Sequence, residues 1–327
     1  MSRRKPIGKL LLAAVVSLGL LALLYGRVDR AQLLVAVQQA WLPLFLLALA
    51  MGGVLSSLTS WRYTHFARRL QIEPAPPFAT ALKSYFLASS LNLFLPSKLG
   101  DLGKGLLCSR LDRRPYPFDL HVFTLYEKVA DLFALVALGA AIGLLRPFDH
   151  GGGIPDLATR WGGVGLAPLL LLLAVPLLIT LVPHRRHGLL ARLLQRAPLK
   201  LREAGMIASR FSLRDFLAFL ALSLLLWALH LLQAVLFAQA LGMPLWSPSG
   251  LFVVVTAILV GLLPISFAGI GTRDATLLVL LGGLYGPARP LLFGVLLTSR
   301  YVVPALVGCL FLGEFGPAVK GTSARAH

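Results

Sequence analysis

The feature that most constrains this chain is a series of apolar runs, each long enough to cross a lipid bilayer. A transmembrane helix needs about 20 mainly apolar residues. Runs of this kind occupy residues 7–25, 41–60, 117–145, 161–183, 213–241 and 289–312. Only 13% of the residues are charged, whereas a soluble domain carries about a quarter. The sequence therefore predicts an all-α polytopic membrane protein in which residues 1–327 form a single integral-membrane domain.

The first apolar run is expected to be a retained span, although it follows a basic start as the core of a signal peptide does. The run from Leu10 to Tyr25 is long for a signal peptide. The sequence Tyr25-Gly26-Arg27 that ends it lacks the small residues of a cleavage site.

Two further apolar regions, 78–112 and 250–285, are each too long for one span and are each broken near the middle. The first is interrupted around Pro96 and the second between Pro264 and Gly271. Non-helical backbone at membrane depth is tolerated only where protein buries it or where it lines a wet cavity. Broken segments in both halves of a chain are a sequence indication of a substrate site in a transporter-like fold.

The distribution of Lys and Arg predicts the orientation, because short cytoplasmic loops are enriched in both. Basic residues mark the N-terminus and flank region 78–112 on both sides, so both ends of this region are expected in the cytoplasm. The loop before region 250–285 is uncharged and is expected outside, and the region is expected to return there. We predict about six full transmembrane helices plus two re-entrant hairpins that enter from opposite faces and place Pro96 within the membrane. Both termini are expected on the cytoplasmic side of the membrane.

The net charge of +18 does not indicate a nucleic-acid partner in a chain of this class, because Lys and Arg also retain cytoplasmic loops and contact anionic headgroups. The most basic stretch, residues 184–214, is expected to be a cytoplasmic loop with an amphipathic helix. Cys108 and Cys309 are isolated, so we predict neither a disulfide framework nor a metal site.

Charged side chains inside apolar segments are the candidates for a functional site. Each costs about 2.5–3.5 kcal/mol at mid-span and usually faces a cavity. Four groups meet this description: Lys98, Asp101 and Lys104 after the first break; Glu127 and Asp131 in a span; Arg273 and Asp274 after the second break; and Arg300 in the last span.

The first group is spaced so that one helix would place its charges on one side, because Asp101 is three residues from both Lys98 and Lys104. The alternative is an interfacial helix start whose dipole favours Asp101. Glu127 and Asp131 are four residues apart and share a helix face, so they need basic partners or water.

The second break has the chemistry of a phosphate site. Gly269 and Gly271 permit a tight turn, and Thr272 is expected to cap the helix that follows. A helix N-terminus with free N–H groups beside Arg273 suits a phosphate.

The role of Arg300 stays open between two possibilities, and three other polar residues are expected to have structural roles. Arg300 either binds a ligand or forms a structural ion pair with Asp101, Glu127 or Asp131. Arg62 is expected to snorkel to the membrane interface. Lys128 is expected to point away from the two acids beside it, and His230 to be a packing residue.

These elements together resemble a known family. Residues 92–104 fit the pattern N-x-x-x-P-G-[RK]-x-G-E-x-x-[RK], with Ser97 in place of Gly and Asp101 in place of Glu. Glu127 to Asp131 resembles an E-[KR]-x-x-D element, and Pro264 to Asp274 resembles P-x-x-x-G-G-x-G-x-R-E. With Arg300, the four elements are similar to those of the lysylphosphatidylglycerol synthase transmembrane region, also described as the flippase-like membrane family.

The resemblance implies a stand-alone lipid flippase or transporter without the soluble synthase domain of the best-understood members. It implies no enzymatic activity, no catalytic residue and no cofactor. Its expected ligands are membrane lipids that are anionic or bear phosphate, with a second copy of the chain or a lipid-synthesis enzyme left open as a protein partner. The substrate-binding residues would be Asn92, Lys98, Asp101, Lys104, Glu127, Asp131, Arg273, Asp274 and Arg300.

Two alternatives to transport stay open. The chain could be a non-transporting membrane subunit or regulator of envelope lipid synthesis. It could also be an integral-membrane transferase that uses a polyprenyl-phosphate donor, although the outer loops contain only Asp29, Asp149 and Asp156 as acids and show no paired motif.

Overall fold

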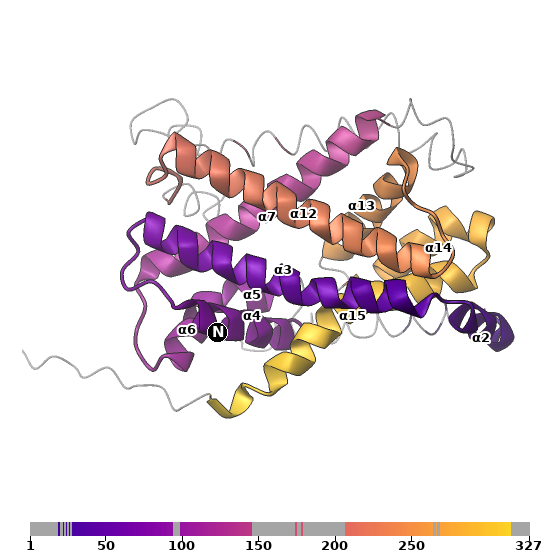
Figure 1. Cartoon of the computed structure of the whole chain (residues 1–327), viewed down its shortest axis with the longest axis horizontal. Helices are drawn as coiled ribbons and strands as arrows, with labels where there is room; N and C mark the ends of the chain where they lie inside the picture. The colour runs from indigo at the N-terminus through magenta and orange to yellow at the C-terminus, as the bar shows by residue number, and fades with distance from the viewer. Residues whose placement is uncertain are drawn as a thin grey trace, which may run out of the picture.

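The computed structural model describes residues 28–93, 99–145, 207–263 and 269–314, together with the single residues 19, 22, 24, 26, 174, 178 and 266. The described ranges form helices joined by turns, with no strand among them (Figure 1). The helices are α2 (Arg30–Gln38), α3 (Leu42–Arg69), α4 (Phe78–Asn92), α5 (Leu99–Leu102), α6 (Lys104–Leu111), α7 (Phe118–Leu145), α12 (Leu213–Ala240), α13 (Pro248–Leu262), α14 (Thr272–Tyr285), α15 (Ala288–Cys309) and the short 3₁₀ helix η4 (Leu312–Glu314).

Four of these helices, α3, α7, α12 and α15, are long and apolar enough to cross a membrane. They coincide with four of the predicted spans, which confirms an all-α polytopic membrane fold. Helix α3 continues to Arg69, beyond the predicted end of its span at residue 60. The predicted spans 7–25 and 161–183 fall almost entirely outside the described residues, as does Pro96.

Helices α3 and α12 run side by side in opposite directions along the bundle (Figure 1). At one end the Trp41 N–H donates to the carbonyl oxygen of Ala240 at 2.8 Å. At the other end Arg69 lies 3.9 Å from Asp215. The antiparallel pairing places the middle of both helices against the interior of the bundle.

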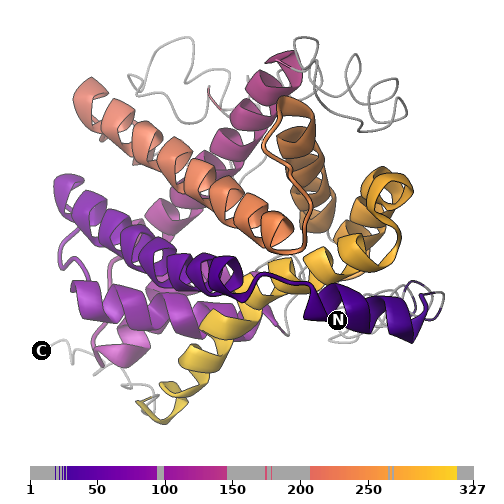
Figure 2. The same ribbon diagram turned by 45° about the vertical axis from the view of Figure 1, so that its right-hand side comes forward.

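Helix α15 crosses the bundle on its other side and packs against α4 (Figure 2). The Ser90 hydroxyl donates to the carbonyl oxygen of Ala305 at 2.6 Å, and Lys83 contacts Glu314 at 2.7 Å. The close approach depends on Gly308, because a Cβ at this position would collide with the carbonyl oxygen of Phe86 and with Ser90.

The Gly308→Ala substitution is expected to destabilise the protein by about 1–3 kcal/mol, because the added methyl group separates α4 from α15. The matched control is Gly283→Ala in α14, where a new Cβ meets nothing within 4 Å. That control is expected to stabilise its helix by roughly 0.5–1 kcal/mol. Thermal denaturation in detergent compares the two variants, and equal midpoints would contradict the packing argument.

Both broken regions fold back on themselves in the structure. Helix α4 ends at Asn92, and the pair α5 and α6 that follows the first break packs against it. Helix α13 ends at Leu262, and α14 packs against both α13 and α15. Gly269 in the second break has φ 76° and lies so close to α13 that a Cβ would come within 2.8 Å of the Cα of Gly261. Glycine is therefore required at position 269 for two reasons, conformation and space.

The expected cap of α14 is corrected by one residue. The N-cap is Gly271, with φ 94°, and not Thr272, which is the first residue of the helix. The side chain of Asp274 reaches back and accepts a hydrogen bond from the Gly271 N–H at 3.0 Å. A positive φ at the cap position explains why glycine replaces the usual Ser or Thr there.

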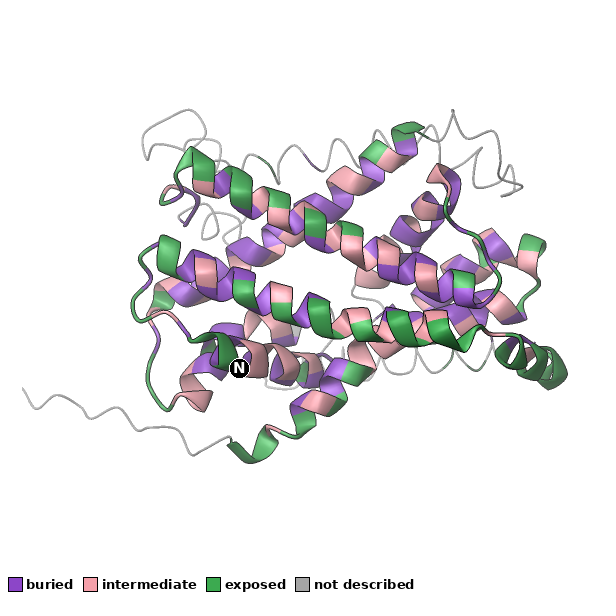
Figure 3. Cartoon of the chain, in the orientation of Figure 1, coloured by how far each residue is buried: buried purple, intermediate pink, exposed green. Residues whose placement is uncertain are grey.

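Exposed residues lie on the outward faces of the helices and buried residues between the helices (Figure 3), and many of the exposed residues are large and apolar. Large apolar side chains such as Leu46, Val54 and Val279 are more than half exposed, as expected for helices that contact lipid. Arg210 pairs with Asp119 at 2.7 Å, which brings the start of α12 to the start of α7. The end of α3 lies there too, and at this end of the bundle Arg68, Arg69, Arg210 and Arg214 outnumber Asp119 and Asp215.

Candidate functional site

A network of buried charges ties α3 to α7 and α6. Arg62 on α3 is fully buried and contacts Glu127 at 3.0 Å and Asp131 at 2.8 Å. Glu127, also fully buried, accepts from Lys104 at 2.8 Å. The Arg62 side chain also donates to the Ser223 hydroxyl of α12 at 2.7 Å. A buried charge is stable only with partners of this kind.

Aromatic rings close the network on its other sides. The ammonium group of Lys104 lies 4.4 Å from the centre of the Tyr63 ring. The guanidinium of Arg62 lies 5.0 Å from the centre of the Phe219 ring. Both geometries permit a cation–π attraction, and the rings separate these two cations from water.

A second set of charges continues from this network toward an open space. Lys128 contacts Asp101 at 2.8 Å and lies 3.9 Å from Asp131. The Asn92 amide donates to the other oxygen of Asp101 at 2.8 Å. The side chains of Lys128, Asp131 and Asp101 are 29%, 21% and 16% exposed, so they form an accessible wall in front of the sealed ion pairs.

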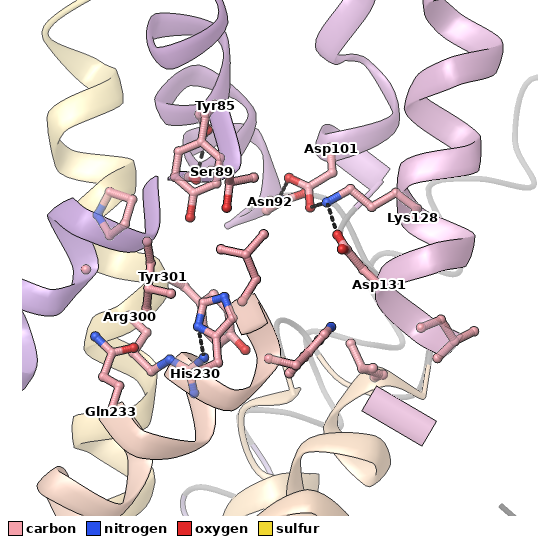
Figure 4. Close-up of a pocket in the computed structure, with 18 of the residues that line it drawn as sticks. Tyr85, Ser89, Asn92, Asp101, Lys128, Asp131, His230, Gln233, Arg300 and Tyr301 are labelled. Atoms are coloured by element: carbon pink, nitrogen blue, oxygen red, sulfur yellow. Dashed lines mark hydrogen bonds and ion pairs between the residues drawn. The ribbon is translucent and has the colours of Figure 1, made fainter. Parts of the chain in front are cut away.

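The open space is a cavity of about 380 Å³ between the helices (Figure 4), which lies in the size range of small-molecule sites. Asn92 and Leu102 reach it from the two sides of the first break, and Leu262 reaches it from the end of α13. The cavity therefore lies beside both sides of the first break and beside the helix that leads into the second. The other lining residues come from α3, α4, α5, α7, α12 and α15: Gly52, Leu55, Thr59, Tyr85, Ser89, Asp101, Lys128, Asp131, Leu132, Leu226, Trp227, His230, Gln233, Arg300, Tyr301 and Pro304.

Arg300 and His230 lie across the cavity from the Asp101–Lys128–Asp131 wall (Figure 4). An Nη atom of Arg300 lies 2.6 Å from Nδ1 of His230. A guanidinium has no acceptor, so Nδ1 must accept and the imidazole is neutral. The Nε of Arg300 is buried and has no hydrogen-bond partner in the described part of the chain. Among the described residues Arg300 forms no ion pair, and the three acids expected as its partners all pair elsewhere.

Arg273 and Asp274 are buried outside this cavity. Arg273 contacts Asp274 at 3.0 Å and donates to the carbonyl oxygen of Gly294 and to the hydroxyl of Thr298. These bonds fasten the start of α14 to α15. The structure thus gives this pair a role in holding the second break, whereas the sequence predicts a phosphate contact.

The predicted site residues fall into four groups. Asn92, Asp101, Asp131 and Arg300 line the cavity. Lys104 and Glu127 form the sealed pair behind it. Arg273 and Asp274 lie apart, and Lys98 lies outside the described residues. Asp101 and Lys104 do not share one helix face, because α5 ends at Leu102 and α6 begins at Lys104.

Two structural interpretations from the sequence were wrong. Arg62 does not snorkel to an interface but is fully buried among acids. Lys128 does not point away from its neighbours but joins Asp101 to Asp131. His230, expected to be a packing residue, packs against Trp227 and also lines the cavity beside Arg300. The signal was present for Arg62, because two carboxylates at mid-span require cations of their own.

Within the described ranges no three His, Cys, Asp or Glu side chains gather in an arrangement that would hold a metal ion.

Comparison with known proteins identifies the family of this chain. The family described as the lysylphosphatidylglycerol synthase TM region matches residues 10–308 of the chain. No curated protein and no solved structure matches the chain.

Proposed function

We propose that this chain, which belongs to the lysylphosphatidylglycerol synthase transmembrane family, is a lipid flippase. In this proposal it moves a phospholipid or a lipid-linked precursor across the cytoplasmic membrane and catalyses no reaction. The observation that carries the proposal is a cavity between the helices with a cation, Arg300, that no acid neutralises among the described residues. Ionisable groups at membrane depth are costly and usually mark a transport pathway.

The geometry suits a headgroup that leaves the membrane interface while its acyl chains stay in lipid. Polar side chains from α3, α4, α7, α12 and α15 converge on the cavity, and the helices around it expose apolar faces. Helices α4 and α13, which lead into the two breaks, end at Asn92 and Leu262 on the cavity lining. We propose that they are re-entrant hairpins that enter from opposite faces and move during transport.

The basic end of the bundle supports a cytoplasmic position for the starts of α7 and α12. We therefore place both termini in the cytoplasm and the protein in the inner membrane of a bacterium. We also propose that the interaction partners are anionic or phosphate-bearing lipids, with a second copy of the chain or a lipid-synthesis enzyme as the protein partners to examine.

Filling the cavity is expected to stop transport. Gly52 lines the cavity, and a Cβ there would meet only Gln233, at 3.8 Å. Its neighbour Gly53 is exposed on the same helix, and a Cβ there meets nothing within 4 Å. Gly52→Phe should reduce the movement of fluorescent phospholipid in proteoliposomes to the rate of protein-free vesicles. Gly53→Phe should leave it unchanged.

These two variants and the wild-type protein together distinguish transport through the cavity from transport by another route. If wild type moves lipid no faster than protein-free vesicles, the flippase proposal is wrong, and a stoichiometric protein partner would then favour a non-transporting subunit. If Gly52→Phe and wild type move lipid equally, transport does not use this cavity.

A further inference from the structure

The acidic wall of the cavity is already neutralised by bases of the protein itself. Three carboxylates and three cations make up the network: Asp101, Glu127, Asp131, Arg62, Lys104 and Lys128. Each carboxylate lies within 3.0 Å of at least one of these cations. A cationic headgroup would therefore have to separate an existing ion pair before it could bind this wall.

The opposite wall of the cavity carries a cation, Arg300, that is not paired with an acid among the described residues. The only hydrogen bond of the Arg300 guanidinium among the described residues goes to His230, which is neutral because its Nδ1 accepts. Asp274, on the neighbouring helix α14, is paired with Arg273. Arg300 thus lines the cavity as a cation that no described acid pairs with. Among the described residues, the cavity lining and the ion pairs behind it together hold three carboxylates and four cations, which leaves one surplus positive charge, on Arg300.

We infer that the ligand of this cavity is a lipid whose headgroup carries one negative charge of phosphate type and no cation. A phosphodiester supplies one negative charge and several acceptor oxygens, which matches a guanidinium. An amine on the same headgroup would face carboxylates that are already paired with cations of the protein, so its charge would not be neutralised. This inference rests on the proposed function and names its substrate class. It disfavours aminoacylated phosphatidylglycerol, the lipid that the family name suggests.

The lining also distinguishes a lipid from a soluble phosphate. Leu55, Leu132 and Leu226 line the cavity beside the charged groups, so the site offers apolar contacts that inorganic phosphate cannot use. The shared chemistry is a phosphate oxygen on Arg300, and binding of phosphate alone must therefore be compared with binding of the lipid.

The first experiment measures transport of lipids that share acyl chains and a phosphodiester and differ in the rest of the headgroup, including its amines. Wild-type protein in proteoliposomes is given fluorescent phosphatidylglycerol, phosphatidylethanolamine or lysylphosphatidylglycerol with identical acyl chains. Phosphatidylglycerol is expected to move at least about tenfold faster than the other two, because their amines would be desolvated in the cavity beside carboxylates that are already paired. Equal movement of all three lipids would overturn the headgroup inference while the flippase proposal stands.

The second experiment measures binding without transport. Thermal midpoints are recorded in detergent with each lipid in mixed micelles and with inorganic phosphate alone. Phosphatidylglycerol is expected to raise the midpoint most, and phosphate alone to raise it little. If the charge preference appears in binding and no lipid moves, the flippase proposal fails and the inference about charge stands. Equal stabilisation by phosphate alone would overturn the assignment to a lipid.

The third experiment reverses the preference. Lys128→Gln removes the cation of the accessible wall, which contacts Asp101 at 2.8 Å, and so makes this wall more negative by one charge. The variant is expected to gain binding of phosphatidylethanolamine relative to phosphatidylglycerol. The matched control, Lys83→Gln, removes a lysine that pairs with Glu314 away from the cavity and should leave the preference unchanged. An unchanged preference in a folded Lys128→Gln protein would contradict the charge argument. If this variant does not fold, the transport and binding measurements on the wild-type protein still test the inference about headgroup charge.

Discussion

Replacing Arg62 by alanine is expected to lower the free energy of unfolding by about 3–5 kcal/mol, the cost of breaking a buried ion pair from one side. Arg62 contacts both Glu127 and Asp131 and is fully buried. Among the described residues, its removal leaves Lys128 as the cation nearest to Asp131, at the longer distance of 3.9 Å. It also leaves a void beside Phe219, whose ring the guanidinium covers.

The stability of the Arg62→Ala variant is measured by denaturant titration in mixed micelles. The matched control is Arg69→Ala on the same helix, where the side chain is 57% exposed and lies 3.9 Å from Asp215. An exposed ion pair of this kind is worth about 0–1 kcal/mol. Adding Asp131→Asn to Arg62→Ala should restore part of the loss, because one uncompensated carboxylate disappears. A loss in Arg62→Ala no larger than in Arg69→Ala would show that the network does not hold the bundle together.

Replacing Arg300 by methionine is expected to have opposite effects on transport and on stability. Transport should fall by about 10–100-fold, because the proposed phosphate contact loses a charged hydrogen bond worth about 1.5–3 kcal/mol. Stability should be unchanged or higher, because a cation without an acidic partner is costly inside a membrane. Residues kept for function commonly show this trade-off.

Transport of Arg300→Met is measured in the same proteoliposomes, and its unfolding by the same titration. Arg289→Met on the same helix is the control, because Arg289 is partly exposed and donates to Gln39 at 3.2 Å. That variant should keep wild-type transport. If Arg300→Met transports lipid at the wild-type rate, Arg300 does not belong to the transport site. One that loses several kcal/mol of stability would indicate a structural role instead.

The two arginines of these predictions differ in how clearly the sequence marks them. Arg300 is conspicuous in the sequence, because it lies in the middle of an apolar span. Arg62 is fully buried in the structure, but its place near the predicted end of a shorter span suggested an interface. The span continues to Arg69, so Arg62 lies about two turns inside the helix end, at about 3.6 residues per turn.

The sequence by itself determined the class of the protein and the places where its helices break. Apolar runs of spanning length predict membrane helices whatever their neighbours are, and Pro and Gly interrupt a helix through local sterics. For the same reason the charged residues were recognisable as unusual. These properties depend on short stretches of the chain, and a short stretch contains all the information they need.

The ion pairs, in contrast, could be identified only from the tertiary structure. Lys104 and Glu127 are 23 residues apart in the chain and pair at 2.8 Å. Arg62 and Glu127 come from different helices and are 65 residues apart. Such pairings depend on how the helices pack, so spacing along one helix could not predict them. The packing also left Arg300 without an acid among the described residues, and this single unbalanced charge is what distinguishes the cavity from the sealed network behind it.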